Sequence, residues 1–150
     1  MERFFEDYEV GQKFGSRTLA VTAEGIKAFA AQFDPQPFHL DEAAARASFF
    51  GGLVASGWHT AAMTMRLLVD GELRPAGGTI GAGGSDLRWP RPVRPGDVLR
   101  VESEVLGMGS SPSCGKPTSA LVSRHEMFTV LSRIMPFLMY RYSQRGYPST

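Results

Sequence analysis

The chain has 150 residues, of which 43% are hydrophobic and 21% are charged, and its formal net charge at pH 7 is +1. This length and composition predict one globular domain over residues 1–150, and the near-zero charge argues against partners such as nucleic acid or an anionic membrane. No apolar stretch is long enough to span a bilayer, and the first residues are not typical of a signal peptide, so we expect a cytoplasmic protein. The single cysteine, Cys114, cannot form an internal disulfide bond and lacks the partners of a metal site.

The first half of the chain predicts a short strand at 19–21 and then helices. Thr22 is a suitable N-cap for a helix over residues 23–33, where apolar residues recur at helical spacing. Pro35 ends this helix and, with Pro37, stiffens a loop over residues 35–39. Asp41 can cap a second helix at 42–47. Residues 58–69 are mostly apolar and Arg66 is their only charged residue, which predicts a helix buried in the centre of the fold.

The second half predicts antiparallel strands. Strands are expected at 85–89, at 99–105 with alternating apolar and charged residues, at 119–130 and at 134–142. A turn is expected at 95–97 and a loop at 107–117. Pro136 predicts a sheet edge or bulge in the last strand. Strands that follow one buried helix indicate an α+β fold.

The best candidate for chemistry is the segment that contains Asp34 and His39. On a loop bent by two prolines, a carboxylate and an imidazole five residues apart can converge on one water and move its proton. The spacing by itself is weak, because an aspartate that caps a turn and a histidine bonded to the backbone would give the same pattern.

The surrounding residues resemble the MaoC-like, or (R)-specific enoyl-CoA hydratase, family. The resemblance covers roughly residues 4–106 in four ordered segments. These are Phe-Glu-Asp-Tyr-Glu-Val-Gly at 5–11, the pattern of Asp34, Pro37 and His39, Leu-Val-Ala-Ser-Gly at 53–57, and Leu-Arg-Trp-Pro-Arg-Pro-Val-Arg-Pro-Gly-Asp at 87–97. It implies the hot-dog fold, in which an antiparallel sheet wraps around one long helix, and at least a homodimer.

The same resemblance implies a hydratase or dehydratase. Such an enzyme adds water to a trans-2-enoyl thioester or removes it from an (R)-3-hydroxyacyl thioester, carried by coenzyme A or acyl carrier protein, and needs no metal or redox cofactor. Asp34 and His39 would form the catalytic pair, and the backbone N–H of Gly57 would stabilise the thioester oxygen. Phe38, Ser56 and Trp58 are candidate substrate-binding residues, although aromatic residues at such positions often belong to the core.

Two positions depart from the family pattern. Gln36 stands where the family commonly has Asn, and Ser56 stands where it often has His before the glycine. Ser56 is also a suitable helix N-cap, and His59 is either a packed histidine or a donor near the thioester. Two other functions remain open for the chain: a hot-dog acyl-CoA thioesterase, and a non-catalytic subunit that binds acyl thioesters.

Four arginines crowd into the segment 88–100. They predict either a solvated strand and turn or contacts with a phosphate-rich ligand such as coenzyme A.

Overall fold

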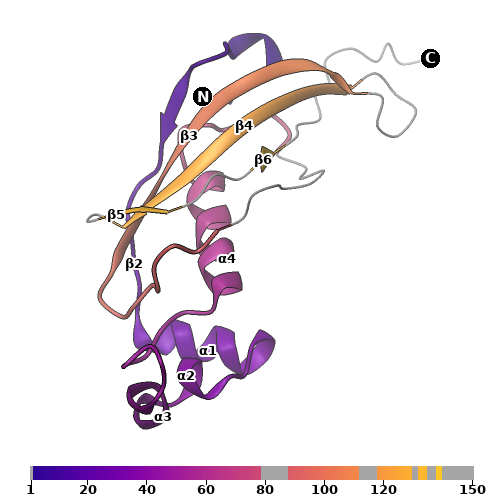
Figure 1. Cartoon of the computed structure of the whole chain (residues 1–150). Coiled ribbons are helices and arrows are strands. Elements are labelled where there is room, and N and C mark those ends of the chain that lie inside the picture. The colour runs from indigo at the N-terminus through magenta and orange to yellow at the C-terminus, as the bar shows by residue number, and fades with distance from the viewer. Residues whose placement is uncertain (1, 79–87, 112–117, 130–131, 135–137, 140–150) are drawn as a thin grey trace, which may run out of the picture.

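The computed structural model describes residues 2–78, 88–111, 118–129, 132–134 and 138–139, and Figure 1 shows how its elements are arranged. In chain order the elements are η1 (Phe5–Asp7), β1 (Lys13–Gly15), β2 (Leu19–Ala20), α1 (Ala23–Phe33), α2 (Pro37–Leu40), α3 (Glu42–Ala47), α4 (Gly57–Val69), β3 (Val98–Ser111), β4 (Thr118–Thr129), β5 (Ser132–Ile134) and β6 (Leu138–Met139).

The six strands of the described residues form one antiparallel sheet around the long pair β3 and β4. β1 and β2 both pair with β3, while β5 and β6 both pair with β4. Along β3, the alternate residues Leu99, Val101, Ser103 and Val105 are buried, as the apolar and polar alternation predicts. The sheet therefore presents one apolar face to the helical layer.

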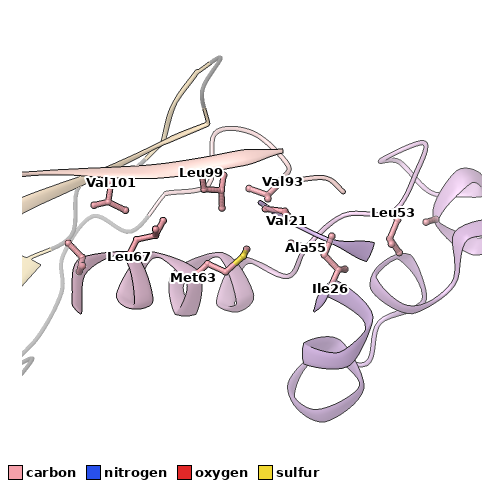
Figure 2. Packing of buried hydrophobic residues seen from close by; sticks show 11 residues of the cluster. Val21, Ile26, Leu53, Ala55, Met63, Leu67, Val93, Leu99 and Val101 are labelled. Atoms are coloured by element: carbon pink, nitrogen blue, oxygen red, sulfur yellow. The ribbon is translucent and has the colours of Figure 1, made fainter. Parts of the chain in front are cut away.

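Helix α4 packs its buried side against this apolar face (Figure 1). Figure 2 shows Met63 and Leu67 directed from α4 toward Leu99 and Val101 on β3. The opposite side of α4 is exposed in the chain, because Trp58 and Val69 are each 63% accessible and Met65 is 37% accessible. The helix is therefore central but buried along one side only, rather than around most of its circumference.

Helices α1, α2 and α3 gather beyond the N-terminal end of α4 (Figure 1). The Thr22 hydroxyl accepts a hydrogen bond from the Gly25 N–H at 3.0 Å and so caps α1, whose Ile26 and Ala30 are fully buried. Asp41 caps α3 in the same way, with its carboxylate accepting from the Ala44 N–H at 2.7 Å. Each cap fixes where its helix begins, and the Val54 N–H in the segment before α4 donates to the Phe38 carbonyl of α2 at 3.4 Å.

Several sequence predictions are confirmed. The helices at 23–33 and 42–47 have the predicted bounds, and the helix predicted at 58–69 begins one residue earlier, at Gly57. The turn at 95–97 forms, with Gly96 at a φ of +89°. The described elements therefore bear out the α+β class.

Other predictions are wrong or fall outside the described residues. Residues 37–40 form a short helix rather than a loop, because proline is well suited to the first position of a helix. Residues 107–111 continue β3 instead of forming a loop, since a register shift between Val105 and Gly107 restores its pairing with β4. The strand predicted at 134–142 gives the two short strands β5 and β6, and its Pro136 lies outside the described residues. Arg88 and Trp89 are not in a strand, while residues 85–87 of that prediction are outside the described part.

None of the described helices combines the length and the apolar character that a membrane crossing requires.

Candidate active site

The side chains of Asp34 and His39 converge at the junction of α1 and α2. Asp34 is the C-cap of α1, and its N–H donates to the Ala30 carbonyl at 3.0 Å. His39 lies on α2, whose first residue is Pro37. The Nε2 atom of His39 is 3.4 Å from Oδ2 of Asp34. The proline-rich segment thus brings the two groups together, although it does so through a short helix.

The other ring nitrogen of His39 fixes the orientation and tautomer of the imidazole. Nδ1 is 2.7 Å from the carbonyl oxygen of Val54, and the ring is almost completely buried. Because a carbonyl oxygen can only accept, Nδ1 must carry the proton. In the neutral ring, Nε2 is then an unprotonated acceptor, and it faces the Asp34 carboxylate.

The carboxylate of Asp34 is supported by both residues that depart from the family pattern. The pKa of Asp34 is held below its ordinary value by a hydrogen bond from the Ser56 hydroxyl, by a second from the Gln36 amide, and by the positive charge that the His39 ring carries when protonated, against the opposing effect of burial. The Gln36 amide donates to Oδ1 at 2.8 Å. Asp34 therefore stays ionised, while 21% of its side chain remains open to solvent.

Ser56 has two functions in the structure, only one of which the sequence predicts. Its hydroxyl accepts a hydrogen bond from the Trp58 N–H at 3.2 Å, so it is the N-cap of α4, as expected. The bond to Asp34 was not predicted, because it joins segments on either side of α2 and α3 that only the fold brings together. Substrate binding by Ser56 stays a prediction.

Gly57 is the first residue of α4, where backbone N–H groups have no partner within the helix. The indole of Trp89 packs on its Cα, and a β-carbon added to Gly57 would lie only 2.8 Å from Cε2 of that ring. The indole Nε1–H also donates to the Gly57 carbonyl at 3.0 Å. The glycine is thus needed to admit Trp89, a reason that differs from the expected close approach of a substrate. Nothing in the sequence pointed to Trp89.

The two other candidate binding residues occupy different environments. Phe38 packs against the buried core and places its ring edge-on to His39, at 4.5 Å between centroids. Trp58 is 63% accessible and makes an edge-to-face contact with Trp89 at 6.0 Å. Phe38 therefore belongs largely to the core, whereas Trp58 is available at the surface of the chain.

His59, two residues after Gly57, is a packed histidine. Its ring stacks on Phe29 of α1 with centroids 4.7 Å apart, and its buried Nδ1 finds no hydrogen-bond partner among the described residues. Burial lowers the pKa of His59, and the positive charge that the nearby His39 ring carries when protonated lowers it further. The structure therefore favours a neutral ring that fills the contact between α1 and α4.

The arginine-rich segment is partly engaged within the chain. Arg94 donates to the Phe50 carbonyl at 2.7 Å, and Arg100 pairs with Glu102. Arg88 and Arg91 are exposed. The segment is thus partly structural, and contacts between its arginines and a phosphate-rich ligand stay a prediction.

A cavity of about 940 Å³ lies at the far end of α4, lined by Arg17, Asp70 and Glu72 among others. Its lining includes neither Asp34 nor His39. Across the described ranges, no group of three or more His, Cys, Asp or Glu side chains could hold a metal ion. The Asp34–His39 pair is therefore the arrangement on which a catalytic proposal can be based.

Comparisons with known proteins agree with this geometry. A family model described as the MaoC like domain matches residues 6–122. The MaoC-like dehydratase from Rhodospirillum rubrum is 47% identical, with a TM-score of 0.84 over 96% of this chain and 99% of that one. The R-hydratase PhaJ1 from Pseudomonas aeruginosa is 26% identical, with a TM-score of 0.74 over 97% and 94% of the two chains. The protein YdeM of Bacillus subtilis (strain 168) is 33% identical over 101 residues, which are 67% of this chain and 72% of that protein.

The family model spans most of the chain, and these likenesses confirm the hot-dog arrangement of an antiparallel sheet around a helix. By sequence and by structure, the chain belongs to the MaoC-like domain family.

Proposed function

We propose that this chain catalyses the reversible addition of water to a trans-2-enoyl thioester, with an (R)-3-hydroxyacyl thioester as the product. The proposal is based on one observation: Oδ2 of Asp34 and Nε2 of His39 lie 3.4 Å apart. With Asp34 ionised and His39 neutral, both atoms are acceptors, and one water can donate an O–H to each. The likeness to an R-hydratase supports the choice of reaction.

The geometry favours His39 as the group that takes the proton of water. Hydrogen bonding lowers the pKa of Asp34, which makes its carboxylate a weak base, whereas imidazole ordinarily titrates near neutral pH. As Nε2 takes a proton, the water oxygen bonds to the β-carbon and the C=C electrons move toward the thioester oxygen. The resulting imidazolium lies beside Asp34, whose negative charge stabilises it.

The remaining steps complete the balance of atoms. The Gly57 N–H, at the positive end of the α4 dipole, donates to the oxygen that becomes enolate-like. The α-carbon then takes back the proton that water gave to the pair, which restores the neutral imidazole. Dehydration is the same sequence in reverse. The proposal requires no metal or redox cofactor, and it takes a coenzyme A or acyl-carrier-protein thioester as substrate and a homodimer as the working form.

A hydration assay on enoyl-CoAs of short to long chain length tests the proposal. The absorbance of the conjugated thioester should fall with wild-type protein, and Asp34→Asn or His39→Ala should each lower turnover by about 10²-fold or more. Asp41→Asn is the matched control, because Asn also caps helices and the Asp41 carboxylate accepts from the Ala44 N–H of α3 rather than from a group of the pair. Its turnover should equal that of the wild type.

Other outcomes would contradict the proposal. Turnover near the wild-type value in both Asp34→Asn and His39→Ala would exclude this pair as the catalytic groups. Release of free thiol from saturated acyl-CoAs would indicate a thioesterase, and binding of enoyl-CoAs without turnover would indicate a non-catalytic subunit. The same assay with enoyl-acyl carrier protein identifies the carrier.

A further inference from the structure

The indole of Trp89 is joined to the Asp34 carboxylate through one peptide group and one hydroxyl. The Trp89 Nε1–H donates to the Gly57 carbonyl at 3.0 Å. The N–H of the same peptide group, which belongs to Trp58, donates to the Ser56 Oγ at 3.2 Å. The Ser56 hydroxyl in turn hydrogen-bonds the Asp34 carboxylate. Three consecutive groups therefore point their donors in one direction, toward the carboxylate.

The segment that carries Trp89 is held in place independently of the indole. The Ala55 N–H donates to the Val93 carbonyl at 2.8 Å, and the Arg94 guanidinium donates to the Phe50 carbonyl at 2.7 Å. These two bonds fix the segment against the chain that leads into α4. The specific effect of the indole is thus its contact with Gly57.

The contact with Gly57 is close and directional, although Trp89 is 41% accessible. Three indole atoms would lie within 3.1 Å of a β-carbon at position 57, so the ring packs directly on the Cα. A side chain that served only to cover apolar surface would have no need of a hydrogen bond to the first carbonyl of the helix. The ring and its N–H together fix the orientation of the peptide group between Gly57 and Trp58.

We infer that Trp89 is a positioning residue for the proposed hydration, which acts on Asp34 through the peptide group of Gly57 and the hydroxyl of Ser56. Donors aligned in a chain polarise one another, so the bond at Trp89 strengthens the bond that Ser56 gives to the carboxylate. The same contact fixes the first turn of α4, and with it the Gly57 N–H that the proposed function assigns to the thioester oxygen. The effect of Trp89 on the reaction rests on the proposed function, but its effect on the Asp34 carboxylate can be measured without turnover.

The test compares Trp89→Phe, which keeps an aromatic ring and removes the N–H, with Ser56→Ala and with the double variant. The carboxyl titration of Asp34 is followed by NMR, and kcat and KM are measured on an enoyl-CoA. Trp89→Phe should raise the pKa of Asp34 and lower kcat by about 1.3- to 4-fold, because the loss of one link weakens the next bond in the chain by roughly 10–30%, with KM unchanged. Adding Trp89→Phe to Ser56→Ala should change neither quantity further, because the chain is already broken.

Gln36→Ala is the matched control. Gln36 supports the same carboxylate from its other oxygen and lies outside the chain of bonds, so its effect should add to that of Trp89→Phe. If the effect of Trp89→Phe added in full to that of Ser56→Ala, as it should to that of Gln36→Ala, the inference would be overturned. An Asp34 titration that Trp89→Phe leaves unchanged would also overturn it.

A measurement on the wild-type protein covers the case in which a variant does not fold. The Trp89 indole N–H should exchange with solvent much more slowly than that of Trp58, the more exposed of the two rings. Equal exchange rates would overturn the inference. If the wild-type protein hydrates no enoyl thioester, the proposed function fails, whereas the titration and the exchange rates still decide whether Trp89 positions the carboxylate.

Discussion

The hydrogen bond between His39 and Val54 allows the catalytic and the structural contributions of this histidine to be separated. An asparagine at position 39 can place its amide N–H where Nδ1 stands, so it can still donate to the Val54 carbonyl. It has no atom that replaces Nε2 as a base. An alanine removes both functions. His39→Asn and His39→Ala should therefore differ in stability and agree in activity.

The magnitudes follow from the burial of the site. His39 is 5% accessible and Val54 is 1% accessible, so His39→Ala leaves a buried carbonyl without its partner, which costs about 1–3 kcal/mol. For a domain of this size, that corresponds to a Tm lower by about 2–12 °C. His39→Asn should retain most of this stability. Both variants should lose about 10²- to 10⁴-fold in kcat, the range of a general acid–base contribution.

Thermal unfolding and the enoyl-CoA hydration assay, run on both variants, give the two readouts. A rate for His39→Asn close to that of the wild type would refute the assignment of Nε2 as the base. A Tm for His39→Ala equal to that of His39→Asn would refute the claim that Val54 holds the ring.

Three further predictions concern other parts of the site and core. Ser56→Ala should raise the pKa of Asp34, because the largest contribution that keeps the carboxylate ionised is lost; a carboxyl titration of Asp34, followed by NMR, that the substitution leaves unchanged would contradict this. The pKa of His59 is lower in the folded than in the unfolded chain, so the unfolded chain binds the proton first and unfolding is favoured as the pH falls through about 6.5. His59→Phe should remove this loss of stability on acidification. In denaturant titrations, the free energy of unfolding should differ less between pH 7.5 and pH 5.5 for the variant than for the wild type. Leu67→Ala, at 1% accessibility under β3, should lower the free energy of unfolding by about 2–5 kcal/mol, and a loss below 1 kcal/mol would mean that the core repacks.

Elements with a clear repeat or cap were predictable from the sequence. Helix α1 could be bounded at both ends because Thr22 caps it and the proline after Asp34 stops it. The alternation in β3 predicts its buried face, since the period of a strand is two. In both cases the physical cause lies within a few residues of the element it determines.

The errors arose where the deciding interaction is distant or the element is short. Four residues cannot show a helical period, so α2 looked like a proline-rich loop. The glycines at 107 and 109 suggested a loop, but pairing with β4 supplies their partners across the sheet. In the site, the Asp34–His39 pair could be predicted because both residues lie on one short segment. The contacts of Ser56 with Asp34 and of Trp89 with Gly57 join distant segments, and no local pattern reports them.

The two departures from the family pattern can now be interpreted physically. Gln36 carries one more methylene group than Asn, yet its amide still reaches Oδ1 of Asp34. Ser56 gives the same carboxylate a hydroxyl where the family often has an imidazole, and it caps α4 with the same atom. Neither residue adds a titratable group beside His39, so both support the Asp34 carboxylate through neutral hydrogen-bond donors. A carboxyl titration of Asp34 that Ser56→Ala and Gln36→Ala each move to higher pH, and that substitutions on the exposed side of α4 leave unchanged, would be the measurable expression of that arrangement.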